Sequence, residues 1–281
     1  MAQAGAPGRG AVPRGLRHPR GVLRPTVGTV TGDVPEPLPT WLPAARRVTV
    51  LTGAGISTDS GIPDFRGPRG VWTRDPEAEK LSTLHFYVTD PEIRRRAWQE
   101  RRAHPAWTAQ PNAGHAALVR LERQGRLRAL VTQNIDGLHQ RAGSSPDLVI
   151  EVHGTLHEVA CLTCGERTTM RSALDRVAAG EPDPACLTCG GILKSATISF
   201  GQALDADVIG AAAGAAAECD LFLAVGTSLT VHPVAGLTDI AAEHGARIVV
   251  VNAEPTPYDD VADLVVREPI GTALPRLLVP A

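Results

Sequence analysis

Four cysteines form two short pairs whose spacing suits a single metal ion. They are Cys161, Cys164, Cys186 and Cys189. Two residues separate the thiols of each pair, so both can face one tetrahedral centre, and Gly165 and Gly190 allow the tight turns that follow. Four thiolates complete the shell of a zinc ion and leave no position for water. The pattern therefore predicts a structural zinc, with a redox-active dithiol as the alternative.

A second feature is the glycine-rich loop Thr-Gly-Ala-Gly-Ile-Ser-Thr at residues 52–58. Gly53 and Gly55 would permit the backbone to approach a pyrophosphate at the start of a following helix. Thr58 stands where a dinucleotide fingerprint has its third glycine, so the loop by itself is a weak signal. Its position directly after an aliphatic run favours nucleotide binding.

The next segment, residues 60–67, reads Ser-Gly-Ile-Pro-Asp-Phe-Arg-Gly. An arginine can pair with a phosphate and an aromatic ring can form one wall of a pocket. Arg66 and Phe65, with Asp64 beside them, are therefore candidate ligand contacts. A surface ion pair between Asp64 and Arg66 is the simpler alternative.

Polar side chains also follow later aliphatic runs. Gln133, Asn134 and Asp136 come after one run, and His153 comes after the next. Amide and carboxylate groups at one strand end can bind an amide and a ribose together, whereas an Asx turn needs only one such residue. An imidazole at the mouth of a nucleotide crevice is a candidate general base near neutral pH, although a lone histidine is more often a satisfied surface residue.

Two further runs end in polar residues that are candidates for ribose and adenine contacts. These residues are Gly226, Thr227, Ser228, Asn252 and Glu254. Five strand ends with polar residues are thus expected to converge on one crevice. The prediction of nucleotide binding depends on this convergence more than on any single motif.

Short aliphatic runs must position these side chains. They lie at 47–51, 128–131, 148–152, 221–225, 247–251 and 264–266. Their length and β-branched composition are typical of buried parallel strands. Helices are predicted between several of them, at 112–125, 205–218 and 233–244. This alternation predicts an α/β fold with a Rossmann-like, doubly wound parallel sheet, which binds ligands beyond the carboxyl ends of its strands.

Composition changes along the chain and indicates its organisation. Residues 1–40 hold seven prolines and five arginines but few bulky apolar side chains, which predicts a disordered tail. A smaller domain is expected from a helical insertion and a zinc-ribbon module. The predicted parts are the tail at 1–40, the Rossmann-like domain at 41–66, 111–155 and 195–281, the helical insertion at 67–110 and the zinc module at 156–194.

Composition also excludes several classes of protein. With 43% hydrophobic and 21% charged residues, the chain of 281 residues can bury a core and is not fully disordered. A net charge of −2 gives no indication of nucleic acid as a specific partner. The most apolar stretch, 209–225, is interrupted by Glu218 and Asp220, and the N-terminus lacks an apolar signal-peptide core. We therefore expect no membrane partner, a cytoplasmic location, and cysteines that bind metal or stay reduced.

Together the motifs resemble those of the sirtuin family of NAD-dependent protein deacylases. The resemblance covers roughly residues 41–278. Residues 57–72 are most similar to the branch that contains nuclear chromatin sirtuins. The matching motifs, in the order of the family, are 53–57, 61–67, 133–137, 153–154, the two cysteine pairs and 226–228.

The resemblance implies that NAD and an acyl-lysine enter a cleft between the two domains. NAD would be a co-substrate: nicotinamide leaves C1′ of the ribose, and the acyl oxygen attacks that carbon. The products would be free lysine, nicotinamide and O-acyl-ADP-ribose. His153 would accept a proton from the ribose hydroxyls, with Asn134 and Asp136 completing the catalytic set at the nicotinamide pocket.

The full predicted NAD-binding set combines the loops above with positions that the resemblance implies. The expected partner is an acylated lysine in a protein, the co-substrate is NAD and the cofactor is one structural zinc. The NAD-binding set is Gly53, Ala54, Gly55, Thr58, Asp64, Phe65, Arg66, Trp72, Gln133, Asn134, Asp136, His153, Gly226, Thr227, Ser228, Asn252, Glu254 and Ile270.

Two departures from the family concern the substrate. Residues 194–202 read Lys-Ser-Ala-Thr-Ile-Ser-Phe-Gly-Gln, where many sirtuins have Lys-Pro-Asp-Val-Val-Phe-Phe-Gly-Glu and pair its backbone with the substrate peptide. The branch that removes acidic acyl groups carries a Tyr-x-x-Arg pair. Neither Tyr87 nor Tyr258 is followed by such an arginine, so desuccinylation is disfavoured.

Three other functions are alternatives to deacylation. Mono-ADP-ribosyl transfer to protein, or hydrolysis of NAD, could use the same cleft. A zinc-bearing module that only senses NAD or contacts nucleic acid is disfavoured by the intact run at 133–136 and by His153. Hydride transfer is disfavoured because the third fingerprint glycine is missing.

Overall fold

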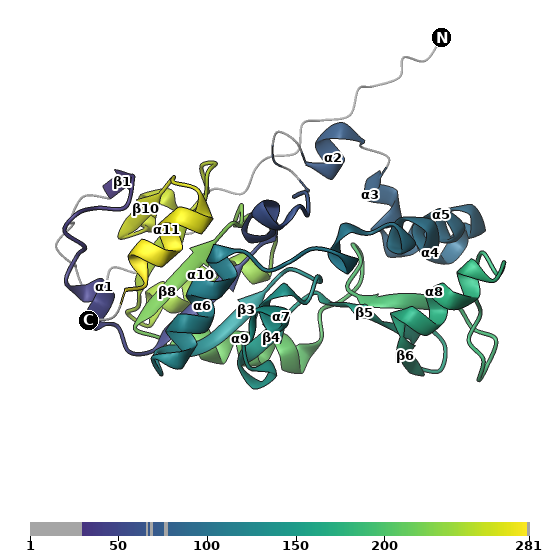
Figure 1. Ribbon diagram of the computed structural model, residues 1–281. Coiled ribbons are helices and arrows are strands. Elements are labelled where there is room, and N and C mark those ends of the chain that lie inside the picture. The colour runs from purple at the N-terminus through teal and green to yellow at the C-terminus, as the bar shows by residue number, and fades with distance from the viewer. Residues whose placement is uncertain (1–29, 66, 68–69, 76–77, 280–281) are drawn as a thin grey trace, which may run out of the picture.

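A seven-stranded parallel sheet forms the centre of the molecule, as the computed structural model of residues 30–65, 67, 70–75 and 78–279 shows (Figure 1). Its order is β1-β10-β9-β8-β2-β3-β4. All six predicted strands are present, and each begins and ends within one residue of the expected position. The strands are β1 (Val30–Gly32), β2 (Val48–Thr52), β3 (Leu127–Thr132), β4 (Val149–Glu151), β8 (Leu221–Val225), β9 (Arg247–Val251) and β10 (Leu264–Val266).

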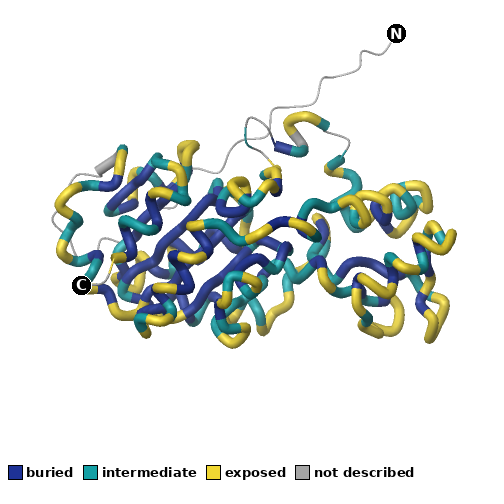
Figure 2. The backbone as a smooth tube through the Cα atoms, viewed as in Figure 1, coloured by how far each residue is buried: buried dark blue, intermediate teal, exposed yellow. Residues whose placement is uncertain are grey.

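Helices cover both faces of this sheet, so its central strands are buried on both sides (Figure 2). Helices α6 (Ala113–Arg123) and α11 (Ile270–Leu277) pack on one face, together with the short α1 (Trp41–Ala44). Helices α9 (Ala206–Glu218) and α10 (Leu237–Glu243) pack on the other. This confirms the predicted α/β, doubly wound class.

The predicted helices also begin where their capping residues indicated. Asn112 accepts hydrogen bonds from the backbone N–H groups of Gly114 and His115, which starts α6. Asp205 caps α9 in the same way. The single helix expected at 233–244 is instead a 3₁₀ turn, η4 (Val234–Gly236), followed by α10.

A smaller antiparallel sheet, in the order β6-β5-β7, lies beside the large one. Helix α8 (Met170–Ala178) and α5 (Pro91–Arg102) share a separate apolar core with it, in which Trp98 is fully buried. The sheet spans residues 154–197, so it extends beyond the expected module at 156–194. Its strands are β5 (Gly154–Cys161), β6 (Arg167–Thr169) and β7 (Leu193–Thr197).

Residues 67–110, expected to be a helical insertion, contain short helices and no named strand among the residues that the structure describes. Asp90 caps the longest of them, α5, by accepting from the N–H groups of Glu92 and Ile93. The others are α2 (Val71–Arg74), α3 (Ala78–Leu81), α4 (Leu84–Thr89) and η2 (Pro105–Trp107).

The prediction of a disordered tail at 1–40 is wrong for residues 30–40, while residues 1–29 lie outside the described part of the chain. Strand β1 adds to the edge of the sheet in parallel register with β10. Val34 is 5% exposed and its N–H donates to Glu268. Composition missed this strand because its hydrogen bonds come from a segment more than 200 residues away. No helix in the described ranges is long and apolar enough to cross a membrane.

Candidate active site and metal centre

Strands β3 and β4 follow β2 on one side of it, whereas β8, β9 and β10 lie on its other side, so the strand order changes direction between β2 and β8. The loops that follow these two parallel strands meet there. The N–H of Gly53 donates to Val225 and that of Gly55 to Gly226, over 3.0 and 2.9 Å. A Cβ at Gly55 would lie 2.7 Å from Cα of Gly226. The glycines are therefore needed for the close approach of two loops, a reason that the fingerprint interpretation did not include. A topological switch point of this kind is where doubly wound sheets bind ligands.

A buried polar cluster lies beside these loops. Asn134 is 8% and Asp136 4% exposed. The side-chain N–H₂ of Asn134 donates to the backbone oxygen of Gly53 at 3.1 Å and contacts Ser57 Oγ at 3.2 Å. Ser57 donates to Asp136 at 2.8 Å, and the second carboxylate oxygen accepts from Leu138 N. The structure thus joins the glycine loop to the segment after β3 through Ser57, which the sequence analysis had not singled out.

Gln133 connects two more of the predicted residues. Its side-chain Nε2 donates to Thr227 Oγ1 at 2.9 Å, which links the segment after β3 to the loop after β8. Its backbone oxygen lies 3.1 Å from Nδ1 of His153. Gly53, Gly55, Gly226, Thr227 and the residues from Gln133 to Asp136 are therefore brought together with His153, as the convergence of strand ends predicted.

The ring of His153 is held in one tautomer. Because a carbonyl oxygen only accepts, Nδ1 carries a proton and the neutral ring keeps its lone pair on Nε2. Nε2 has no hydrogen-bond partner among the described residues. Burial lowers the pKa of His153 below the ordinary value, and the hydrogen bond to Gln133 opposes this only in part. The half-buried ring is thus a neutral base at about pH 7.

Two predicted contacts of the segment 58–65 use their polar groups locally. Thr58 is exposed and donates to the backbone oxygen of Gly55. The carboxylate of Asp64 accepts from Gly67 N at 3.1 Å, which closes a turn. Phe65 is 41% exposed, and Ala54 is half-buried at the start of η1 (Ala54–Ser60). Arg66 and the side chain of Trp72 lie outside the described residues.

Four other residues predicted to contact ribose and adenine lie in turns or at the start of a helix: Ser228, Asn252, Glu254 and Ile270. Ser228 shares a hydrogen bond with Thr230, over 2.7 Å. Asn252 donates to the backbone oxygen of Glu254, so both belong to one turn after β9. Ile270 begins α11, and a Cβ at Gly114 of α6 would lie 3.0 Å from its Cγ2.

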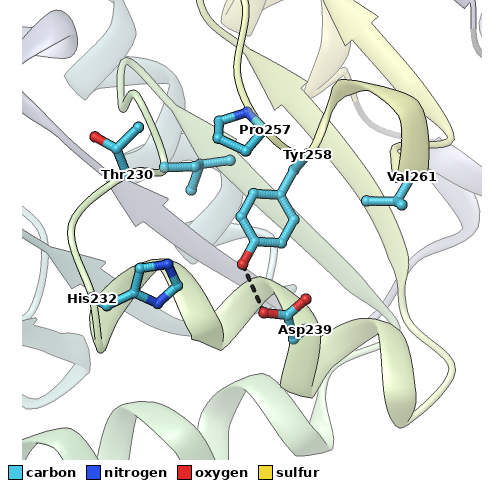
Figure 3. Close-up of a pocket in the computed structure, with 7 residues that line it drawn as sticks. Thr230, His232, Asp239, Pro257, Tyr258 and Val261 are labelled. Atoms are coloured by element: carbon cyan, nitrogen blue, oxygen red, sulfur yellow. Dashed lines mark hydrogen bonds between the residues drawn. The ribbon is translucent and has the colours of Figure 1, made fainter. Parts of the chain in front are cut away.

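A cavity of about 450 Å³ opens beside this region (Figure 3). It lies between the loop after β8 and the connection from β9 to β10, which contains η5 (Asp259–Val261). The hydroxyl of Tyr258 donates to Asp239 at 2.7 Å in its wall. Thr230 and His232 also line it, but no described residue of the predicted NAD-binding set does. The sequence analysis did not anticipate this cavity, because its walls come from separate loops.

The four paired cysteines meet in space. All four Sγ atoms lie within 4.8 Å of one another, with Cys161–Cys189 at 3.5 Å and Cys164–Cys186 at 3.7 Å. Tetrahedral ligands at the usual zinc–sulfur distance stand roughly 3.8 Å apart. The donor set and its spacing therefore fit a closed structural zinc site. Cys219 is separate and buried, and its thiol donates to Ala216 O.

Comparison with known proteins agrees with this geometry. The family model described as "Sir2 family" matches residues 53–233. "NAD-dependent protein deacetylase 2" of Streptomyces coelicolor is 59% identical over 231 residues, which are 82% of this chain and 96% of that protein. The chain belongs to the Sir2 family.

Other Sir2 relatives agree in length and fold. "NAD-dependent protein deacetylase 1" of Bradyrhizobium diazoefficiens is 41% identical over 85% of this chain and 93% of its own length. The solved structure "Sir2-p53 peptide-NAD+" has a TM-score of 0.74 at 34% identity and covers 84% of this chain and 94% of that one. "Structure of Sir2Tm bound to a propionylated peptide" has a TM-score of 0.75 at 33% identity, with the same two coverages. The similarity to the chromatin branch stays a prediction.

Proposed function

We propose that this Sir2 chain is an NAD-dependent protein lysine deacylase, in the first place a deacetylase, that transfers the acyl group to ADP-ribose and releases nicotinamide. Its Sir2 membership, the activity named for its relatives, and the relatives' complexes with NAD and with acylated peptides support this assignment. The observation that carries it in this chain is the tautomer of His153, whose Nε2 is left unprotonated and has no hydrogen-bond partner within the described ranges. ADP-ribosyl transfer is not favoured by the comparisons.

We assign the chemistry to three residues. Bound NAD supplies an electrophilic ribose carbon whose leaving group departs as neutral nicotinamide. His153 Nε2 accepts a proton from a ribose hydroxyl, while the bond from Nδ1 to Gln133 keeps the ring oriented. Asn134 and Asp136 form the nicotinamide end of the site, held by Ser57. The rest of the predicted set, including Arg66 and Trp72, would contact ribose, phosphate and adenine.

The protein substrate would enter between two domains, for which we keep the division predicted above. The acyl-lysine peptide would dock along residues 194–202, whose Ile198 N–H donates to the backbone oxygen of His153 at 2.8 Å. Lys194 is buried, and its Nζ binds the backbone oxygens of Ser195 and Thr197, so its charge is not available to the peptide. The cytoplasmic location, and the absence of a specific nucleic acid partner, remain predictions from the sequence.

Replacing His153 tests the function most directly. We expect His153→Ala to lower kcat by about 10²- to 10⁴-fold and to leave NAD affinity within a few-fold, because only the base is lost. His244→Ala is the matched control, since that histidine is exposed at the end of α10. Mass spectrometry of the parent reaction should find O-acetyl-ADP-ribose. ADP-ribosylated protein or free ADP-ribose alone, or full turnover by His153→Ala, would contradict the proposal.

A further inference from the structure

A buried histidine that the mechanism does not use is linked by a chain of hydrogen bonds to Asn134, at the proposed nicotinamide end of the site. His139, on α7 (Leu138–Ala142), is 1% exposed. Its Nε2 lies 2.9 Å from the hydroxyl of Thr52, the last residue of β2. Thr52 in turn bonds the hydroxyl of Thr132, the last residue of β3, over 2.8 Å. The two hydroxyls thus join the carboxyl ends of these neighbouring strands, and the imidazole bonds to the first of them.

This chain of bonds ends on the backbone of a proposed nicotinamide contact. The hydroxyl of Thr132 accepts the N–H of Asn134 at 3.1 Å. The side chain of Asn134 is fixed in its turn by Gly53 O and Ser57 Oγ. The backbone of Asn134 is therefore linked to His139 through the hydroxyl groups of Thr132 and Thr52.

The imidazole has little freedom to do anything else. Thr52 donates to Thr132, so Nε2 of His139 supplies the proton of the bond to Thr52. Its ring centroid is 4.9 Å from that of His115, which is also fully buried. Burial, and then the neighbouring His115, lowers the pKa of His139 to about 3. The ring is thus neutral and packed, and acts as a fixed donor.

We propose that His139 is a positioning residue, which acts through Thr52 and Thr132 to hold Asn134 in the orientation that binds the nicotinamide of NAD. The inference rests on the proposed function, because it takes Asn134 as a nicotinamide contact. It predicts that loss of the Nε2 donor impairs the use of NAD more than the use of the acylated peptide.

The test compares two substitutions in the full, zinc-loaded chain. His139→Gln keeps an N–H at the same number of bonds from Cα, whereas His139→Leu keeps bulk without a donor. We expect the leucine variant to raise KM for NAD and the half-inhibitory concentration of nicotinamide by about ten-fold or more, with KM for an acetylated peptide changed by less than about two-fold. The glutamine variant should stay within about three-fold of the parent in all three.

Two results would overturn the inference. One is a folded leucine variant with the parent's values for NAD and nicotinamide. The other is a glutamine variant as impaired as leucine, which would mean that ring packing rather than the hydrogen bond matters. If the leucine variant does not fold, Thr132→Val and Thr132→Ser repeat the comparison at the hydrogen bond between Thr52 and Thr132. Only Thr132→Val, which lacks the hydroxyl group, should then use NAD less well than the parent.

Two measurements separate this inference from the proposed function. The parent's NAD-dependent deacetylation judges the function alone. Calorimetric titration of NAD into the parent and the variants judges the positioning role even if the parent does not deacetylate the chosen peptide. Equal NAD affinity in the parent, leucine and glutamine chains would reject the role of His139.

Discussion

The two ends of β5 show two ways of holding loops together. Near its start, segments after β2, β3 and β8 are joined by direct hydrogen bonds among buried side chains such as Ser57, Asn134 and Asp136. Near its end, four thiols face one another at the edge of a small core, and Cys164 and Cys189 are exposed. The first region is completed by the polypeptide itself, whereas the second needs an ion. The two regions should therefore fail under different perturbations.

Removal of the zinc should have the largest effect and should act on the cysteine end first. Structural zinc contributes on the order of 10 kcal/mol to the folding of small metal-binding units. We expect Cys186→Ser to abolish stoichiometric zinc and to unfold the sheet of β5, β6 and β7. Activity should be lost with it, because Ile198, just after β7, bonds to His153. Atomic absorption and thermal unfolding measure both effects.

Cys219→Ser is the control for this change. The thiol is buried in the core between the large sheet and helices α9 and α10, and it is not part of the cluster. Zinc content should stay at the parent's level in this variant. A Cys186→Ser chain that kept its zinc and its unfolding transition would remove the contrast between the two ends.

A single methyl group should perturb the other end through its close packing. Gly226 has φ of +60°, and a Cβ there would lie 2.5 Å from the backbone nitrogen of Ile56. We expect Gly226→Ala to cost about 3 kcal/mol in the free energy of unfolding, measured in urea, with zinc retained. Gly210→Ala on α9, where a Cβ meets nothing within 4 Å, should instead stabilise by about 0.5–1 kcal/mol. Equal effects of the two substitutions would show that the loops tolerate separation.

Acid should weaken the hydrogen-bonded end gradually, with a small effect for each pH unit. Burial lowers the pKa of His115 to about 4 and that of His139 to about 3. The unfolded chain binds these protons near the ordinary pKa, so the stabilisation is complete above about pH 6.5 and is lost as the pH falls through the folded values. Each histidine contributes a slope of up to about 1.4 kcal/mol per pH unit in that window. Urea titrations at several pH values should find that the free energy of unfolding changes less steeply with pH in His139→Gln than in the parent. An equal slope in the two chains would contradict the contribution assigned to His139.

Local sequence patterns predicted the parts of the site that depend on strands and spacing. Aliphatic runs predicted six strands, and paired cysteines predicted a cluster of four thiols. The polar residues after the strands predicted that Gln133, Asn134, Asp136 and His153 lie near one another. Ser57 was part of a quoted motif, yet its bonds to Asn134 and Asp136 were not foreseen. The signal that could have found them is a hydroxyl residue in the loop after β2, because the neighbouring strand β3 is followed by Asn134 and Asp136.

What escaped prediction depends on contacts between segments far apart in the chain. The bond from Thr52 to His139 spans 87 residues, and that from Gln133 to Thr227 spans 94. Periodicity and turn chemistry describe only near neighbours, so they cannot indicate which hydroxyl meets which ring. The same limit explains why β1 was assigned to the tail and why the glycines at 53 and 55 were explained by a ligand alone.

The short edge strand β1 has a consequence for how the protein can be trimmed. It covers the outer backbone groups of β10, whose residues Leu264, Val265 and Val266 are fully buried. A fragment that began at Trp41 would leave that row of amides and carbonyls open beside apolar side chains. Such an edge is a template on which a strand of another molecule can add, so the shortened chain would be prone to self-association while the surroundings of His153 stayed intact.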